Sequence, residues 1–79
     1  MRKLRNGEIV QLLKEADDIR CSTMSISHEQ NDAIVYGLKQ EISTLAKALA
    51  TSRVLNEYDA QGECLLRLAD AYYRLADCW

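Results

Sequence analysis

Apolar residues recur at steps of three and four through the middle of the chain. The recurring positions are Val35, Leu38, Ile42, Leu45 and Leu49. This spacing is typical of a stripe along one side of an α-helix, and Ile34 with neighbouring alanines makes the stripe wider than a two-helix contact requires. The pattern predicts a long central helix over residues 27–53, whose apolar face must be covered by other elements or by a partner.

A second helical pattern precedes the central one. Apolar residues at positions 9, 10, 12, 13, 16 and 19 predict a helix over residues 6–21. Serines and a threonine between residues 22 and 27 predict a loop, and Ser27 with Gln30 fits a capping box at the start of the central helix. Gly37 interrupts the central helix beside its stripe, and close approach of a neighbouring helix is one reason for a glycine there.

The apolar pattern changes phase after residue 53. It resumes at Leu65, Leu68, Tyr72, Leu75 and Trp79, two residues out of register with the central stripe. One continuous helix would place the two stripes on different sides, so we expect a turn between residues 54 and 59. A third helix is then expected over residues 59–78.

Charged residues of this third helix are spaced four apart. Glu63 with Arg67 and Asp70 with Arg74 stand in the acid-first order that stabilises a helix. Rows of this kind usually line a solvated face, so we expect all four side chains to point outward.

These segments predict an all-α fold in a single domain over residues 1–79. We expect a small three-helix bundle in which the second and third helices form an antiparallel hairpin and the first packs across them. A chain of 79 residues buries only a modest core. Because the central helix has such a wide apolar face, we expect the bundle to form a homodimer or a helical heterocomplex through its second and third helices.

Composition agrees with a helical fold and weighs against several classes of protein. The chain has no proline and three glycines, and 48% of its residues are hydrophobic. Its formal net charge of −2 argues against a dedicated nucleic-acid-binding domain, which is usually basic. No stretch of about 18 apolar residues is present and no apolar core follows the basic start. We therefore expect no membrane partner, no signal peptide and a cytoplasmic location.

Residues that could carry chemistry are few and scattered. His28 opens the sequence HEQND, but Asp32 stands where a zinc motif of the HExxH type has its second histidine. Cys21, Cys64 and Cys78 lack the short spacings of zinc or redox motifs, so we expect reduced cysteines, with an intersubunit disulfide as the alternative. The sequence thus predicts no enzyme activity, no catalytic or metal-binding residue, no cofactor and no small-molecule substrate.

The N-terminal segment MRKLRNGEIVQLLKEADDIRC resembles the start of the transposase OrfA proteins of insertion elements. The resemblance is carried by EIVQLLKEAD and implies a basic N-terminus leading into the first helix of a helix-turn-helix. Beyond residue 21 the chain departs from that pattern, because a polar connector and a long helix without a basic recognition face follow. We therefore do not extend DNA reading to this chain on the resemblance.

Aromatic residues beside the apolar stripes indicate a protein interface. Tyr36 and Tyr73 lie one position off the stripes of their helices, where aromatic side chains are common interface anchors. The residues expected at the interface are Ile34, Tyr36, Leu38, Ile42, Leu45, Leu49, Leu65, Tyr72, Tyr73 and Trp79.

The expected function is that of a non-enzymatic helical interaction module. It would be a small accessory or inhibitor protein, of phage or mobile-element type, that binds a partner protein or a second copy of itself. The alternative is a small dimeric DNA-binding or transcription-regulating protein. That protein would contact nucleic acid through the basic tail of residues 1–5, with Arg2, Lys3 and Arg5, together with the first helix.

Overall fold

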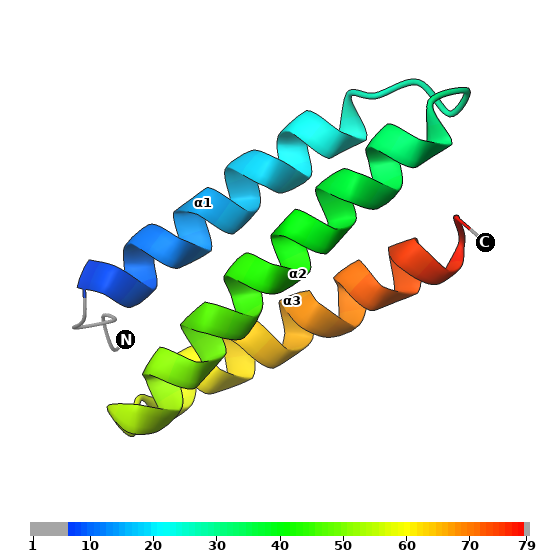
Figure 1. The fold of residues 1–79 in the computed structure, drawn as a ribbon. Coiled ribbons are helices and arrows are strands. Elements are labelled where there is room, and N and C mark those ends of the chain that lie inside the picture. The colour runs from blue at the N-terminus through cyan, green and yellow to red at the C-terminus, as the bar shows by residue number, and fades with distance from the viewer. Residues whose placement is uncertain (1–6, 79) are drawn as a thin grey trace.

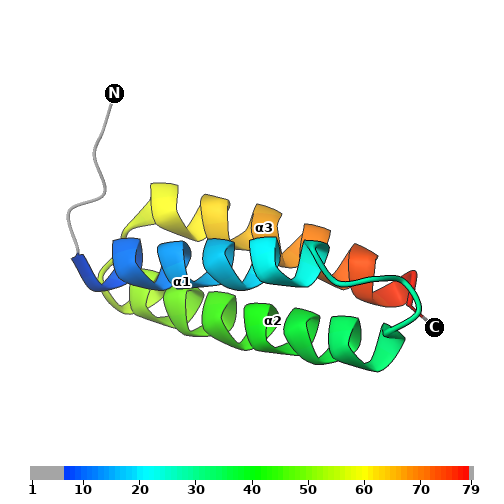
Figure 2. The same ribbon diagram turned by 90° about the horizontal axis from the view of Figure 1, so that it is seen from above.

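The computed structural model describes residues 7–78, which form three helices. They are α1 (Gly7–Met24), α2 (Asn31–Val54) and α3 (Tyr58–Ala76), and no strand occurs within the described range. The helices lie side by side along the long dimension of a 40 × 20 × 18 Å body (Figures 1 and 2). The predicted all-helical class with three helices is confirmed.

Helix α1 continues three residues beyond the predicted end at residue 21 and runs alongside α2, not across the other two helices (Figure 1). The serines and threonine expected in a loop are partly helical, because their hydroxyl groups bond to the helix itself. Thr23 Oγ1 donates to the carbonyl oxygen of Ile19 at 2.8 Å, and Ser25 Oγ donates to that of Cys21 at 3.1 Å.

Helix α2 begins at Asn31, four residues after the predicted start, and the expected capping box does not form. Ser27 Oγ accepts a hydrogen bond from the Glu29 amide at 3.3 Å, within a turn that precedes the helix. Gln30 occupies the N-cap position without a side-chain cap bond, while Asp32 adds a negative charge to the first turn.

The connection between α2 and α3 spans residues 55–57, inside the stretch where the change of phase places it. Asn56 has a φ of 55°, a left-handed conformation that asparagine tolerates better than most residues. This explains how the chain turns here without glycine or proline.

The ends of α3 both contact α2. Gln61 Nε2 donates to the Ser52 carbonyl oxygen at 3.3 Å, and Asn31 Nδ2 donates to that of Cys78 at 3.2 Å.

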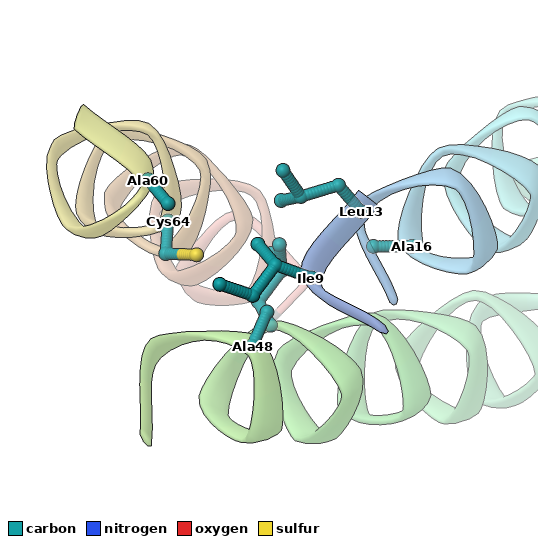
Figure 3. Packing of buried hydrophobic residues seen from close by; sticks show 7 residues of the cluster. Ile9, Leu13, Ala16, Ala48, Ala60 and Cys64 are labelled. Carbon is teal, nitrogen blue, oxygen red and sulfur yellow. The ribbon is translucent and has the colours of Figure 1, made fainter. Parts of the chain in front are cut away.

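The core lies where the three helices meet, and the fully buried residues that α3 contributes to it are small (Figure 3). The buried cluster consists of Ile9, Leu13, Ala16, Leu45, Ala48, Ala60 and Cys64, with Leu12, Leu49 and Leu68 packed against it. On α3 the fully buried residues are Ala60, Cys64 and Ala71. Small side chains let α3 approach its neighbours closely, and apart from the half-buried Leu68 and Leu75 its larger apolar residues lie on other sides of the helix.

Two arginines of α3 turn inward to meet acidic residues of the other helices. Arg67 lies 2.7 Å from Glu63, as its spacing predicts, and also 2.7 Å from Asp17 of α1. Arg74 lies 2.9 Å from Asp70 and bonds both carboxylate oxygens of Glu41, which is buried in α2. The expectation of a solvated face is therefore corrected for the two arginines, which are half-buried and link the helices, while Glu63 and Asp70 are exposed.

Gly37 has a packing role within the chain. A Cβ built at this position would meet the side chain of Thr23, its hydroxyl oxygen most closely. The expectation that a neighbouring helix approaches closely at Gly37 is therefore confirmed, with α1 as the neighbour.

We expect Gly37→Ala to lower the free energy of unfolding by about 1–3 kcal/mol, the usual range for overpacking a close contact. Urea denaturation followed by circular dichroism measures this change. The matched control is Gly62→Ala on α3, where a Cβ meets nothing within 4 Å. At submicromolar concentration the free energy of unfolding of this control should rise by about 1 kcal/mol, because alanine has a higher helix propensity than glycine. Equal stability changes in the two variants would contradict the role assigned to Gly37.

Candidate protein interface

One side of α3 presents large apolar side chains to solvent. The exposed fractions are 73% for Tyr58, 50% for Leu65, 72% for Leu66, 56% for Tyr72 and 70% for Tyr73. At about 100° per residue these positions fall on one side of the helix. Gly62, Ala69 and Ala76 lie among them and are also exposed. We call these eight residues the outer face of α3.

The outer face lies opposite the side of α3 that packs in the core. Ala60, Cys64 and Ala71 occupy the buried side, about 100–180° away from Leu65 and Ala69 around the helix axis. Glu63 and Asp70 separate the two apolar sides along one edge. Helix α3 is thus apolar on two sides, and the fold covers only one of them.

The structure divides the residues expected at an interface into several groups. Leu65, Tyr72 and Tyr73 lie together on the outer face of α3. Leu38 and Leu45, at 1% and 0% exposed, are enclosed within the chain and offer nothing to a partner in this structure.

The other expected residues do not join the outer face. Ile34, Ile42 and Leu49 are half-buried on α2. Tyr36 is exposed, but it lines a hollow between α1 and α2 beside Ile19 and Thr23. Trp79, Arg2, Lys3 and Arg5 lie outside the described residues. The apolar surplus expected on α2 is therefore found on α3, because the neighbouring helices cover most of the α2 stripe.

Tyr58 and Leu66 were not among the residues expected at an interface. Both belong to the same side of α3 as Leu65, at steps of seven and one residues. The signal was present in the spacing. The stripe expected through Leu65, Leu68, Tyr72 and Leu75 does not lie on one side in the structure, because Leu65 and Tyr72 are exposed whereas Leu68 and Leu75 are half-buried.

A hollow of about 420 Å³ lies at the end of the bundle where α1 connects to α2, and it is lined by both apolar and polar groups. Met24, Ile26 and Ile34 line it together with His28, Arg74 and Cys78. The Arg74 guanidinium is already bonded to Glu41 and Asp70, so its charge is compensated within the chain. Within residues 7–78 no group of three His, Cys, Asp or Glu side chains comes together to hold a metal ion.

The three cysteines are free thiols in different surroundings. Cys21 is exposed, Cys78 is half-buried and Cys64 is buried in the core. Burial raises the pKa of the Cys64 thiol above 9.0, although the nearby Arg67 charge acts in the opposite direction. A higher thiol pKa means less thiolate at neutral pH, so Cys64 is expected to react slowly.

None of the three helices, over the part of the chain that is described, has the combination of length and apolar character needed to cross a membrane. Comparison with protein families, with curated proteins and with solved structures finds no match for this chain.

Proposed function

We propose that this protein is a non-enzymatic helical module that binds another protein chain through the outer face of α3. The observation that carries the proposal is the grouping of five large apolar side chains, each at least half exposed, on one side of one helix. Scattered apolar residues are normal on protein surfaces, but contiguous patches with a polar border mark interaction sites. Tyrosine is also among the residues that supply most interface energy.

The charges around the outer face favour a protein over a nucleic acid as the partner. Glu63, Asp70 and Asp77 run along one edge of the face, and phosphate groups would be repelled there. Helix α1, which the alternative function would use, carries Lys14 and Arg20 against four acidic residues. A DNA-binding role would therefore depend on Arg2, Lys3 and Arg5, outside the described range.

The mode of action that fits such a module is occupation of a partner's surface. A chain of 79 residues can contribute a helix face to a complex without contributing a reaction site. A small accessory or inhibitor protein acts in this way, and we retain that as the proposed role.

Site-specific photocrosslinking in the native host tests the proposal. A photoreactive phenylalanine analogue replaces Leu66 on the outer face, and in a control it replaces Val54 on α2, which is 80% exposed. We expect a discrete protein adduct, identified by mass spectrometry, from position 66 and none from position 54. Absence of an adduct from position 66, and likewise from position 73, would contradict the proposal.

Salt-dependent retention on DNA distinguishes the DNA-binding alternative from the proposed function. We expect no retention on a DNA column at about 50 mM salt, where phosphate contacts are strong. Retention that is lost when Arg2, Lys3 and Arg5 are neutralised would support the DNA-binding alternative.

A further inference from the structure

We infer that the occupant of the outer face of α3 is α3 of a second copy of this chain, packed in the opposite direction about a two-fold axis. This inference rests on the proposed function, because it uses the same face, and it names the partner. It depends on the order of large and small residues along α3, on the surroundings of Gly62 and on the area of the face.

Large and small residues alternate along the outer face in two seven-residue series. The large series is Tyr58, Leu65 and Tyr72, and the small series is Gly62, Ala69 and Ala76. Each small residue follows a large one by four positions. This is the relation between the two core positions of a heptad repeat, which form the contact between packed helices.

Antiparallel packing matches every large residue with a small one. If the two-fold axis passes near the level of Arg67, Leu65 faces Ala69 of the second copy, and Tyr72 faces Gly62 of the second copy. Tyr58 then faces the second copy's Ala76. The same contacts recur on the other side of the axis, as a two-fold interface requires. The 19 residues of α3 span about 28 Å, so all these layers fit along one helix.

Parallel packing of the same face would fit poorly. It would oppose Gly62 to Gly62 in one layer and Leu65 to Leu65 in the next. Layers of two small residues leave voids, whereas layers of two large residues push the helices apart. The order of residue sizes therefore favours the antiparallel direction.

Gly62 is a second, independent observation. A glycine inside a helix lowers helix stability relative to alanine, and Gly62 lies within α3 without a positive φ. Nothing lies within 4 Å of a Cβ built there, so the protomer itself does not require a glycine. At Gly37, in contrast, Thr23 requires one. Close approach of Tyr72 from a second copy would explain why a glycine occupies position 62.

The area of the face suits a modest dimer. Three tyrosines at 56–73% exposure present on the order of 400 Å². Leu65, Leu66 and the alanines add to this, which brings the face close to the roughly 800 Å² per partner of a standard protein interface. The face is therefore large enough for a second copy and is formed by a single helix.

Sedimentation velocity on a dilution series of the full chain, from about 1 to 200 μM, tests self-association. We expect a reversible monomer–dimer equilibrium. Ala69→Glu places a charge at the centre of the pairing and should weaken dimerisation at least tenfold, while circular dichroism stays unchanged. The matched control Ala46→Glu makes the same substitution at an exposed alanine of α2 and should leave dimerisation within twofold. A strict monomer, or equal effects of the two variants, would overturn the inference.

Disulfide trapping tests the direction of packing. Two variants carry Leu65→Cys or Ala69→Cys, both with Cys21→Ser and Cys78→Ser, while Cys64 stays in place because it is fully buried. We expect a mixture of the two to form disulfide-linked dimers at least tenfold faster than either variant alone. Faster linking of Leu65→Cys alone would indicate parallel packing and overturn the inference.

The two proposals can fail separately. A monomeric chain whose position 66 crosslinks to a different protein would overturn the self-pairing of α3 and leave the proposed function standing. A monomeric chain with no adduct at positions 66 and 73 would overturn both.

Discussion

Replacing Arg74 by alanine should lower the free energy of unfolding by about 3 kcal/mol, because it leaves the Glu41 carboxylate buried without its counter-charge. Arg74 Nη1 and Nη2 donate to the two carboxylate oxygens of Glu41 at 3.3 and 2.8 Å. The Glu41 side chain is 3% exposed and that of Arg74 is 22% exposed. We use the lower end of the usual range for a broken buried pair because water can reach the arginine side. Urea denaturation at neutral pH measures the change.

Arg74 stays charged throughout the pH range of interest. Burial lowers the pKa of its guanidinium, but hydrogen bonds and charges from Glu41 and Asp70 raise that pKa by more, so it lies above its ordinary value. Arg74→Ala therefore removes a full positive charge at any pH used for the measurement.

Two control variants separate the cost of leaving Glu41 without its counter-charge from the net contribution of the Glu41–Arg74 pair to stability. Asp70→Ala removes the exposed acid that also contacts Arg74, and we expect a loss of no more than about 1 kcal/mol. The double variant Glu41→Leu with Arg74→Leu should recover most of the stability lost in Arg74→Ala, because it removes both buried charges. A loss below about 0.5 kcal/mol in Arg74→Ala would contradict the role assigned to this pair.

Leu45→Ala should lower the free energy of unfolding by about 3 kcal/mol, the middle of the range for a buried leucine replaced by alanine. Leu45 is 0% exposed and belongs to the cluster shared by all three helices. A chain of 79 residues is expected to have a total stability of roughly 4–12 kcal/mol. Thermal and urea denaturation should therefore show the loss of about a quarter to three quarters of the total stability.

The matched control for Leu45 is Leu65→Ala on the outer face of α3. Leu65 is half exposed in the protomer, so at submicromolar concentration its replacement should cost less than about 1 kcal/mol. The sequence predicts both leucines at one interface. This pair of variants tests whether Leu45 belongs to the core and Leu65 to the surface. Equal losses would contradict the division between core and outer face.

The number of helices and the position of the second turn follow from the sequence, because they depend on spacing alone. The ends of α1 and α2 do not. Thr23 and Ser25 favour loops, yet here their hydroxyls bond to carbonyl oxygens one turn earlier. Ser27 can cap a helix, but Ser27 Oγ instead accepts a bond from Glu29 in a turn. Such choices are made by competing local hydrogen bonds of similar energy.

The side of α3 that enters the core could not be predicted from hydrophobicity. Leu66 and Tyr73 are more apolar or larger than Ala60 and Ala71, yet the alanines are buried. Close packing against α2 rewards small residues, and the Arg74–Glu41 pair fixes the rotation of α3. Both effects depend on contacts between segments far apart in sequence, so a pattern within one helix cannot reveal them.

The short connections, residues 25–30 and 55–57, affect the order in which folding and any association take place. Each helix packs mainly against its neighbour in sequence, and helical proteins with such local contacts fold in microseconds to milliseconds. At micromolar concentration two protomers meet only every 0.1–10 s or so. Folding is thus complete before encounter, so in the dimer inferred above two finished surfaces would join, and subunits would exchange without unfolding.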